Sequence, residues 1–168
     1  VPPDTCRCYG SGKINGFFAL CERNSWEDLA ITPALETGPA CAQISAPPVA
    51  QATEKDSWPT YRGDISRSGS STSPVPADPV RVWSTPIGPT VTAPVIANGK
   101  VFVAERDAYA VHCLDRSTGE RCWKYLARGP VDSPPTFYRG LCIFGCGDGS
   151  VYCLDADSGA LAWRFKTS

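Results

Sequence analysis

The feature that most constrains this chain is an internal repeat in its C-terminal half. Residues 91–125 align with residues 131–165 at an offset of 40 without a gap, and eight of the 35 aligned positions are identical. The residues shared in this way are Val91, Pro94, Val111, Cys113, Leu114, Asp115, Gly119 and Trp123. One period earlier, Trp83 falls in the same phase. A fixed period of this length indicates a supersecondary unit that packs against its neighbours.

Each repeat reads as four short strands separated by turns. In the first unit the predicted strands are 91–96, 101–104, 110–114 and 121–125. The Asn98-Gly99 pair between the first two favours a tight hairpin, because both residues tolerate positive φ. A period of about forty residues with four strands is typical of a propeller blade, whereas a parallel β-helix has shorter rungs and a helical repeat needs helical periodicity. We therefore expect an all-β fold, a β-propeller of four-stranded blades that is incomplete in this chain.

The turn before each repeated Trp resembles the tryptophan-docking motif of quinoprotein-type propellers, A-x-D-x-x-T-G-x-x-x-W. The matching residues are Asp115, Thr118, Gly119 and Trp123 in one unit and Asp155, Ser158, Gly159 and Trp163 in the next. An Asp can accept backbone N–H bonds within its own turn, and Gly can adopt the unusual φ that leaves the turn. The indole, here and at Trp83, then offers a flat apolar surface to the neighbouring blade. The motif is therefore predicted to be structural, with no catalytic residue in it.

A second resemblance lies upstream of the repeats. The run from Trp58 to Gly69 resembles the W-P-x-x-R-x-D-x-x-R-S-G lead-in of pyrroloquinoline-quinone (PQQ)-like repeat proteins of planctomycete type, a group described as BamB-like. Residues 131–154 are similar to the same group. The resemblance implies that the lead-in lies next to the first blade and contributes a closing strand, and an ordered surface loop stays open as the alternative.

Composition shifts divide the chain into four parts. Residues 1–44 are predicted to be a small β unit, in which Cys6–Tyr9 and Lys13–Leu20 can form a hairpin; it resembles the last blade of a preceding propeller. Residues 45–57 lack aromatics and long aliphatics and read as a linker. The lead-in occupies 58–80, and the first blades of a PQQ-like propeller occupy 81–168. A ring needs about four to eight blades, so we expect a fragment of a larger protein.

Charge and composition exclude several functions. Sixteen Lys and Arg residues against 17 Asp and Glu leave a net charge of −1, with no basic run that would bind nucleic acid. The longest apolar run, 17–21, is too short to span a membrane. Nine cysteines without a Cys-x-x-Cys, together with a single histidine, His112, argue against a metal site. Most of these cysteines are expected to be buried thiols, with one or two disulfides as the alternative.

The function predicted from these features is a non-catalytic scaffold that binds a protein or peptide. The candidate surface loops are Glu105–Tyr109 and Cys146–Gly149, which join the second and third strands of each unit. Remaining blades of the propeller are the other expected partners. No cofactor, no metal and no catalytic residue is predicted, and the family resemblance implies a location in the cell envelope.

Two alternatives stay open at this point. The repeat is shared with dehydrogenases that use PQQ and calcium, although this sequence has neither their adjacent Cys-Cys pair nor a recognisable cluster of calcium-binding carboxylates and amides. The propeller could also be an accessory domain fused to an enzyme such as a methyltransferase. Neither a Gly-rich nucleotide loop nor a Ser-His-Asp set is visible in the chain.

Overall fold

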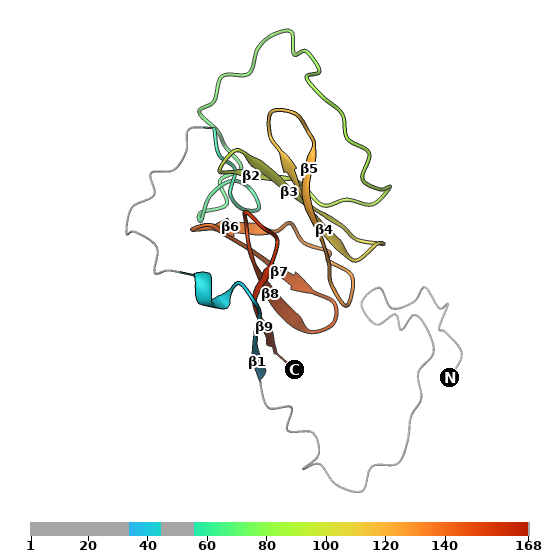
Figure 1. Cartoon of the computed structure of the whole chain (residues 1–168). Helices are drawn as coiled ribbons and strands as arrows, with labels where there is room; N and C mark the ends of the chain where they lie inside the picture. Colours follow the sequence, from blue (N-terminus) through green and yellow to red (C-terminus); the bar gives the residue numbers. More distant parts are fainter. Residues whose placement is uncertain (1–33, 45–55, 168) are drawn as a thin grey trace, which may run out of the picture. The chain divides into compact units, whose positions relative to one another are not determined.

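The computed structural model describes residues 34–44 and 56–167, and within them the structure is all-β (Figure 1). The predicted hairpin of Cys6–Tyr9 with Lys13–Leu20 lies outside the described residues, as does most of the predicted linker. The one helical element described is a single 3-10 turn, η2 (Cys41–Gln43). The described part of the chain contains no helix that is long and apolar enough to cross a bilayer.

The two repeats form two antiparallel sheets. The strands of the first are β2 (Val95–Ala97), β3 (Lys100–Glu105), β4 (Ala110–Asp115) and β5 (Arg121–Leu126), hydrogen-bonded in chain order. The strands of the second are β6 (Thr136–Tyr138), β7 (Leu141–Cys146), β8 (Ser150–Asp155) and β9 (Leu161–Lys166), also in chain order. The predicted fold of four-stranded propeller blades is therefore confirmed, and the sheets are called blade 1 and blade 2 below.

The first strand of each blade is shorter than predicted. The prediction began it at Val91, whereas β2 begins at Val95 and Val91 forms only an isolated bridge with Glu105. Pro94 has no N–H to give to a ladder, and Thr92 exchanges hydrogen bonds with Ala104 partly through its side-chain Oγ1. The segment before β2 is therefore an irregular edge and not a regular strand.

The gapless alignment of the repeats is also wrong over their first halves. Val95 pairs with Phe102 as Thr136 pairs with Ile143, so these strands repeat at an offset of 41. The offset returns to 40 from Ala110, which corresponds to Ser150. The turn after β3 has four residues and the turn after β7 has three. This difference of one residue brings the offset back from 41 to 40 before the docking motif.

The hairpin predicted at Asn98-Gly99 is confirmed by positive φ angles of 52° and 68°. Arg139-Gly140 occupies the same place in blade 2 with φ angles of 51° and 79°. Positive φ at both central residues gives a turn whose twist matches that of the strands it connects.

The main hydrophobic core lies between the two blades. Val111 and Cys113 of β4 are fully buried in one cluster with Tyr152 and Leu154 of β8. Tyr125 of β5 packs edge-on against Phe144 and Tyr152 of blade 2, with ring centroids 6.3 and 6.0 Å away. The two sheets therefore pack face to face through apolar and aromatic side chains, as neighbouring blades do.

The lead-in lies against the first strands of both blades. Trp58 exchanges two backbone hydrogen bonds with Ile96 of β2, with N–O distances of 2.6 and 2.9 Å. The backbone N–H of Phe137 in β6 donates to the carbonyl of Pro59 at 2.7 Å. The lead-in thus contributes a single bridge, and no full strand, at the edge where β2 approaches β6.

Residues 34–44, which the prediction placed in a separate N-terminal unit, pair with blade 2. Strand β1 (Ala34–Thr37) runs antiparallel to β9 and makes a fifth strand, so that the order is β1-β9-β8-β7-β6 (Figure 1). After β1, Gly38 N–H donates to the carbonyl of Ala162 and Ala40 N–H to that of Leu161.

Two glycines of positive φ provide a matched test of blade packing. A Cβ at Gly159 (φ 71°) would lie 2.6 Å from the ring of Trp123, whereas a Cβ at Gly140 (φ 79°) would meet nothing within 4 Å. Both Ala variants bear the cost of a left-handed backbone, about 1–2 kcal/mol. We expect Gly159→Ala to lose about 1–3 kcal/mol more, because it also overpacks the blade contact.

Urea unfolding followed by circular dichroism measures this difference. Equal losses of unfolding free energy in Gly159→Ala and Gly140→Ala would contradict the packing of Trp123 on this turn.

Candidate functional site

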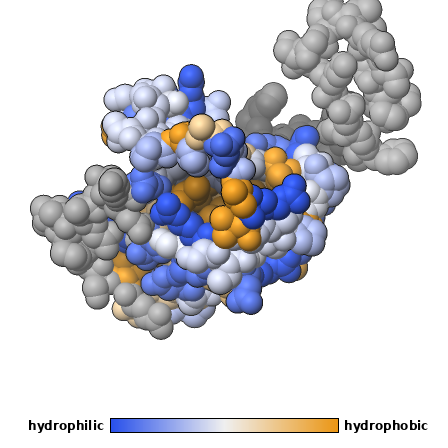
Figure 2. All heavy atoms as spheres, turned by 90° about the horizontal axis from the view of Figure 1, so that it is seen from above, coloured by the Kyte–Doolittle hydropathy of each residue, from blue (hydrophilic) through white to orange (hydrophobic). Residues whose placement is uncertain are grey.

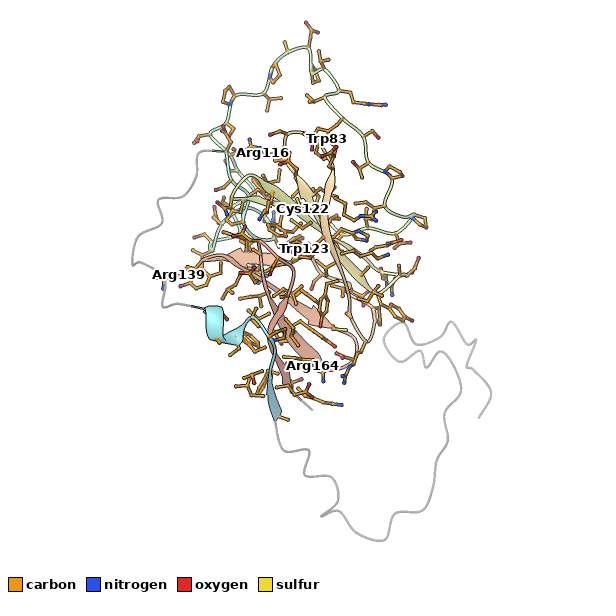
Figure 3. The ribbon with its side chains drawn as sticks, viewed as in Figure 1. Trp83, Arg116, Cys122, Trp123, Arg139 and Arg164 are labelled. Atoms are coloured by element: carbon orange, nitrogen blue, oxygen red, sulfur yellow. The ribbon has the colours of Figure 1, made fainter. Side chains whose placement is uncertain are left out.

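The predicted docking residues of blade 1 come together around Trp83. The Trp83 indole N–H donates to the carbonyl of Arg116 at 2.9 Å (Figure 3). A Cβ at Gly119 would lie 2.5 Å from the Trp83 ring, so only a glycine lets the ring approach this closely. Thr85 adds a hydrogen bond from its hydroxyl to the carbonyl of Gly119 at 2.6 Å.

Blade 2 repeats this arrangement with Trp123. The Trp123 indole N–H donates to the carbonyl of Ala156 at 3.0 Å, and its ring lies against Gly159. Ala156 is the blade 2 counterpart of Arg116, so the donor, the acceptor position and the glycine are the same in both copies. The Trp123 indole therefore fixes blade 1 to the turn of blade 2, and the Trp83 indole fixes the segment before blade 1 to the turn of blade 1.

The motif aspartates hold these turns in shape. Asp115 Oδ1 accepts from the backbone N–H groups of Ser117 and Thr118 at 2.8 and 2.9 Å. These bonds, the one from Thr118 first, hold the pKa of Asp115 below its usual value. Asp155 Oδ1 accepts from the N–H and the hydroxyl of Ser158. Burial acts to raise the pKa of Asp155, but the hydrogen bonds from Ser158 and Asp157 and the charge of Lys100 together lower it.

Trp163 occupies the third position of the series in different surroundings. The described residues contain no third turn for it, and it packs beside Ala40, Ile44 and Ile143. An apolar hollow adjoins its ring, lined by Leu35, Thr37, Cys41, Val151, Trp163 and Phe165. The structure therefore brings Trp83 and Trp123 to their turns and leaves Trp163 without one.

The two candidate loops lie at the other end of the blades, where the connections between blades also pass. Ala127 N–H donates to the carbonyl of Tyr109, and Gly147 N–H donates to the carbonyl of Pro130. Arg106 forms an ion pair with Asp132 across the two blades. We call this end, formed by Glu105–Tyr109 and Cys146–Gly149, the turn face.

A hollow of about 430 Å³ opens at the turn face, lined by Thr90, Val91, Thr92, Arg106 and Asp132. Thr90 donates its hydroxyl proton to Asp107 at 2.7 Å, which ties the segment before β2 to the loop. The hollow thus combines an ion pair, hydroxyl groups and a half-exposed Val91, a mixture suited to contacts with a polypeptide.

A buried polar group that sequence reasoning missed lies beside this face in blade 1. His112, with 1% of its side chain exposed, shares a hydrogen bond of 3.0 Å between its Nε2 and Glu105 Oε2. Lys124 Nζ lies 4.0 Å from the same carboxylate oxygen. The Nδ1 atom of His112 is buried and has no partner among the described residues.

Blade 2 holds different residues at the same three positions. Tyr152 replaces His112, Arg164 replaces Lys124, and Cys146 replaces Glu105. Tyr152 donates its phenol proton to Asp148 at 2.6 Å, and the Arg164 guanidinium lies 5.6 Å from the centre of the Tyr152 ring. The alignment of the repeats placed His112 opposite Tyr152 and Lys124 opposite Arg164, which was the available signal for this cluster.

The six cysteines that the structure describes are free thiols, and Cys113, Cys142 and Cys153 are buried. Burial raises the pKa of Cys113 to about 12 and that of Cys153 to about 11, so both stay protonated at neutral pH. Within residues 34–44 and 56–167, no three His, Cys, Asp or Glu side chains gather where a metal ion could bind.

The burial of His112 leads to a prediction of how the free energy of unfolding depends on pH. Desolvation lowers its pKa below 6.5 in the folded protein, although the bond to Glu105 acts in the opposite direction. The unfolded chain therefore binds a proton first, and stability falls as the pH drops below 6.5, by no more than about 1.4 kcal/mol per pH unit. We expect the urea midpoint to be lower at pH 5.5 than at 7.5.

The variant His112→Gln should remove most of this pH dependence, since His112 is the only histidine in the sequence. A wild-type midpoint that is the same at both pH values would contradict a neutral, buried His112.

Comparison with known proteins places these features in a family. The family model described as outer membrane protein assembly factor BamB matches residues 62–168. The DNA damage-responsive serine/threonine-protein kinase RqkA of Deinococcus radiodurans is 30% identical over 126 residues, covering 67% of this chain and 18% of the kinase. The outer membrane protein assembly factor BamB of Burkholderia pseudomallei is 30% identical over 86 residues, covering 51% of this chain and 22% of that protein.

Solved structures of the same repeat type also match. A quinohemoprotein alcohol dehydrogenase of Pseudomonas putida is 23% identical with a TM-score of 0.42, over 46% of this chain and 13% of its own. BamB of Moraxella catarrhalis is 23% identical with a TM-score of 0.40, over 42% and 21%. Neither score reaches 0.5, and the fold assignment rests on the strand topology above. The family model matches more than half of the residues of this chain, and the chain therefore belongs to the BamB-like family of PQQ-like repeat proteins.

Proposed function

We propose that this chain is part of a non-catalytic propeller scaffold that binds a protein or peptide partner at its turn face. The observation that carries the proposal is that the two ends of the blades differ in their contacts. Glycine, aspartate and indole groups at one end are engaged in blade packing. The loops at the other end, Glu105–Tyr109 and Cys146–Gly149, carry the charged side chains of Glu105, Arg106, Asp107 and Asp148, and loops on a rigid scaffold commonly carry binding.

The chain is proposed to be a fragment of a longer ring. It spans about a fifth of the length of the curated relatives it matches. On the face seen in Figure 2, hydrophobic side chains line a central hollow and lie beside it, bordered by hydrophilic ones, and others lie elsewhere on the same face. Exposed apolar surface of this kind is expected where a further blade or a partner packs.

The alternative of a PQQ- and calcium-dependent dehydrogenase fits the described residues poorly. Calcium takes six to eight oxygen ligands from several carboxylates and amides, and the described residues bring no such acidic group together. The sequence also has no adjacent cysteines. We assign no step of that chemistry to this chain.

A second candidate is an accessory propeller joined to an enzyme. The observation that favours it is the match of 67% of this chain to a protein kinase. On this candidate the blades would still act by binding, and the catalytic domain would lie elsewhere in the protein.

Photo-crosslinking distinguishes a binding face from an inert one. A photoreactive phenylalanine placed at Tyr109, which is 46% exposed on the turn face, should give a discrete protein adduct in native cells. The matched control is the same residue at Tyr138, which is 54% exposed at the opposite end of its blade. Equal adducts at both positions, or none at Tyr109, would contradict the proposal.

Calorimetric titration of the protein with PQQ and calcium completes the test. We expect no heat of binding beyond dilution. Tight binding followed by alcohol-dependent reduction of a dye would replace the scaffold with an enzyme.

A further inference from the structure

Two thiols of blade 1 lie next to each other on neighbouring strands. Cys113 of β4 pairs with Trp123 of β5, and Leu114 pairs with Arg121, so Cys122 is the extra residue of a bulge. A bulge sets two residues of one strand opposite one residue of the other. The thiols of Cys113 and Cys122 share a hydrogen bond at this point. Cys122 directly precedes the docked Trp123, and both are labelled in Figure 3.

Blade 2 has the same bulge with one different residue. Its register also shifts between Cys153 and Leu154, and Ala162 takes the place of Cys122. Cys153 and Ala162 are fully buried in one cluster, which shows that the bulge brings these two positions into contact. Blade 1 therefore differs from its repeat by a second sulfur at this contact.

The spacing of the two positions suits a disulfide. Residues that face each other across an antiparallel pair have Cα atoms about 4.5–5.5 Å apart, inside the range of about 4.4–6.8 Å for a disulfide. The bulge adds Cys122 to the residues that face Cys113, and the two thiols are already in contact.

A link at this point would enclose the docking turn of blade 1. The chain from Cys113 to Cys122 includes residues 115–119, on which the Trp83 ring lies. The next residue, Trp123, is the one that reaches the turn of blade 2. One covalent bond would therefore restrain both indole contacts.

Solvent reaches the two thiols unequally. Cys122 is exposed, whereas Cys113 is fully buried. Burial raises the pKa of Cys113 to about 12, and the charge and hydrogen bond of Cys122 raise it further. Cys142 of β7 packs in the same core as Cys113, but it is fully buried as well. A reagent in solution therefore reaches Cys122 first, and Cys113 only through Cys122.

We propose that Cys113 and Cys122 are a redox pair that closes to a disulfide by exchange with a small organic disulfide. The Cys122 thiolate attacks one sulfur of the reagent and releases its other half, which takes up a proton. The Cys113 sulfur, after losing its proton to water, then displaces the second half from Cys122. The pair loses two electrons and two protons, and the reagent becomes two thiols. This reaction does not involve the turn face, so it stands or falls independently of the proposed function.

Mass spectrometry of the full chain tests the pairing. The reduced protein is incubated with oxidised glutathione, remaining thiols are alkylated, and the chain is digested with trypsin without reduction. Cleavage after Lys and Arg puts Cys113 in the peptide 107–116 and Cys122 in the peptide 122–124. We expect these two peptides to be joined, and dithiothreitol to separate them.

Three variants provide the controls. Cys122→Ser should leave the peptide 107–116 alkylated, and Cys113→Ala should stop the reaction at a glutathione adduct on the peptide 122–124. Cys146→Ser, which removes a half-buried thiol of the turn face, should leave the link unchanged. Because Cys122 is exposed, Cys122→Ser keeps the test valid if Cys113→Ala does not fold.

Thermal unfolding measures what the link does to the blades. Closing a short loop restrains the unfolded chain, so we expect the oxidised protein to unfold about 5 °C above the reduced protein, with no such rise in Cys122→Ser.

Three outcomes would overturn the proposal. The first is a link from the peptide 107–116 to the peptide 140–164, which would pair Cys113 with a thiol of blade 2. The second is a wild-type chain in which Cys122 remains alkylated or keeps a stable glutathione adduct. The third is a linked protein whose unfolding temperature equals that of the reduced form.

Discussion

The contact on which the structure depends is an indole ring lying on a glycine, with its N–H bonded to a carbonyl of the same turn. It occurs twice, at Trp83 over Gly119 and at Trp123 over Gly159. The ring supplies a large apolar surface, and the hydrogen bond fixes its orientation. Because the Trp123 contact joins blade 1 to blade 2, it positions the two sheets relative to one another, and with them the loops at their far ends.

Packing of this kind tolerates change elsewhere in the repeat. Blade 1 has one residue more in its β3–β4 turn than blade 2 has in the matching turn, yet both return to the same phase before the motif aspartate. The polar group beside the turn face also changes, from Glu105, His112 and Lys124 to Cys146, Tyr152 and Arg164. In blade 1 the basic residue, Lys124, has the carboxylate of Glu105 in its own sheet, whereas in blade 2 Arg164 is paired with Glu36 of β1.

Much of the fold could be predicted because its determinants are local and repeated. The pair Asn98-Gly99 is enough by itself to predict a hairpin, and the recurring Asp, Gly and Trp of the docking motif predict the blade. The short β2 could not be read from its apolar residues, since Pro94 and the Thr92 side chain interrupt the ladder. The pairing of Glu36 with Arg164 joins residues 128 positions apart and has no counterpart in the repeat, so no pattern in the sequence pointed to it.

Hydrogen exchange of the indole N–H groups, followed by NMR on the chain labelled with ¹⁵N-tryptophan, tests the blade-docking account most directly. The indole N–H groups of Trp83 and Trp123 are bonded to carbonyls in packed turns, whereas the described residues offer no acceptor to that of Trp163. We predict that Trp83 and Trp123 exchange much more slowly than Trp163. Exchange of Trp123 as fast as that of Trp163 would contradict the docking of one blade on the next.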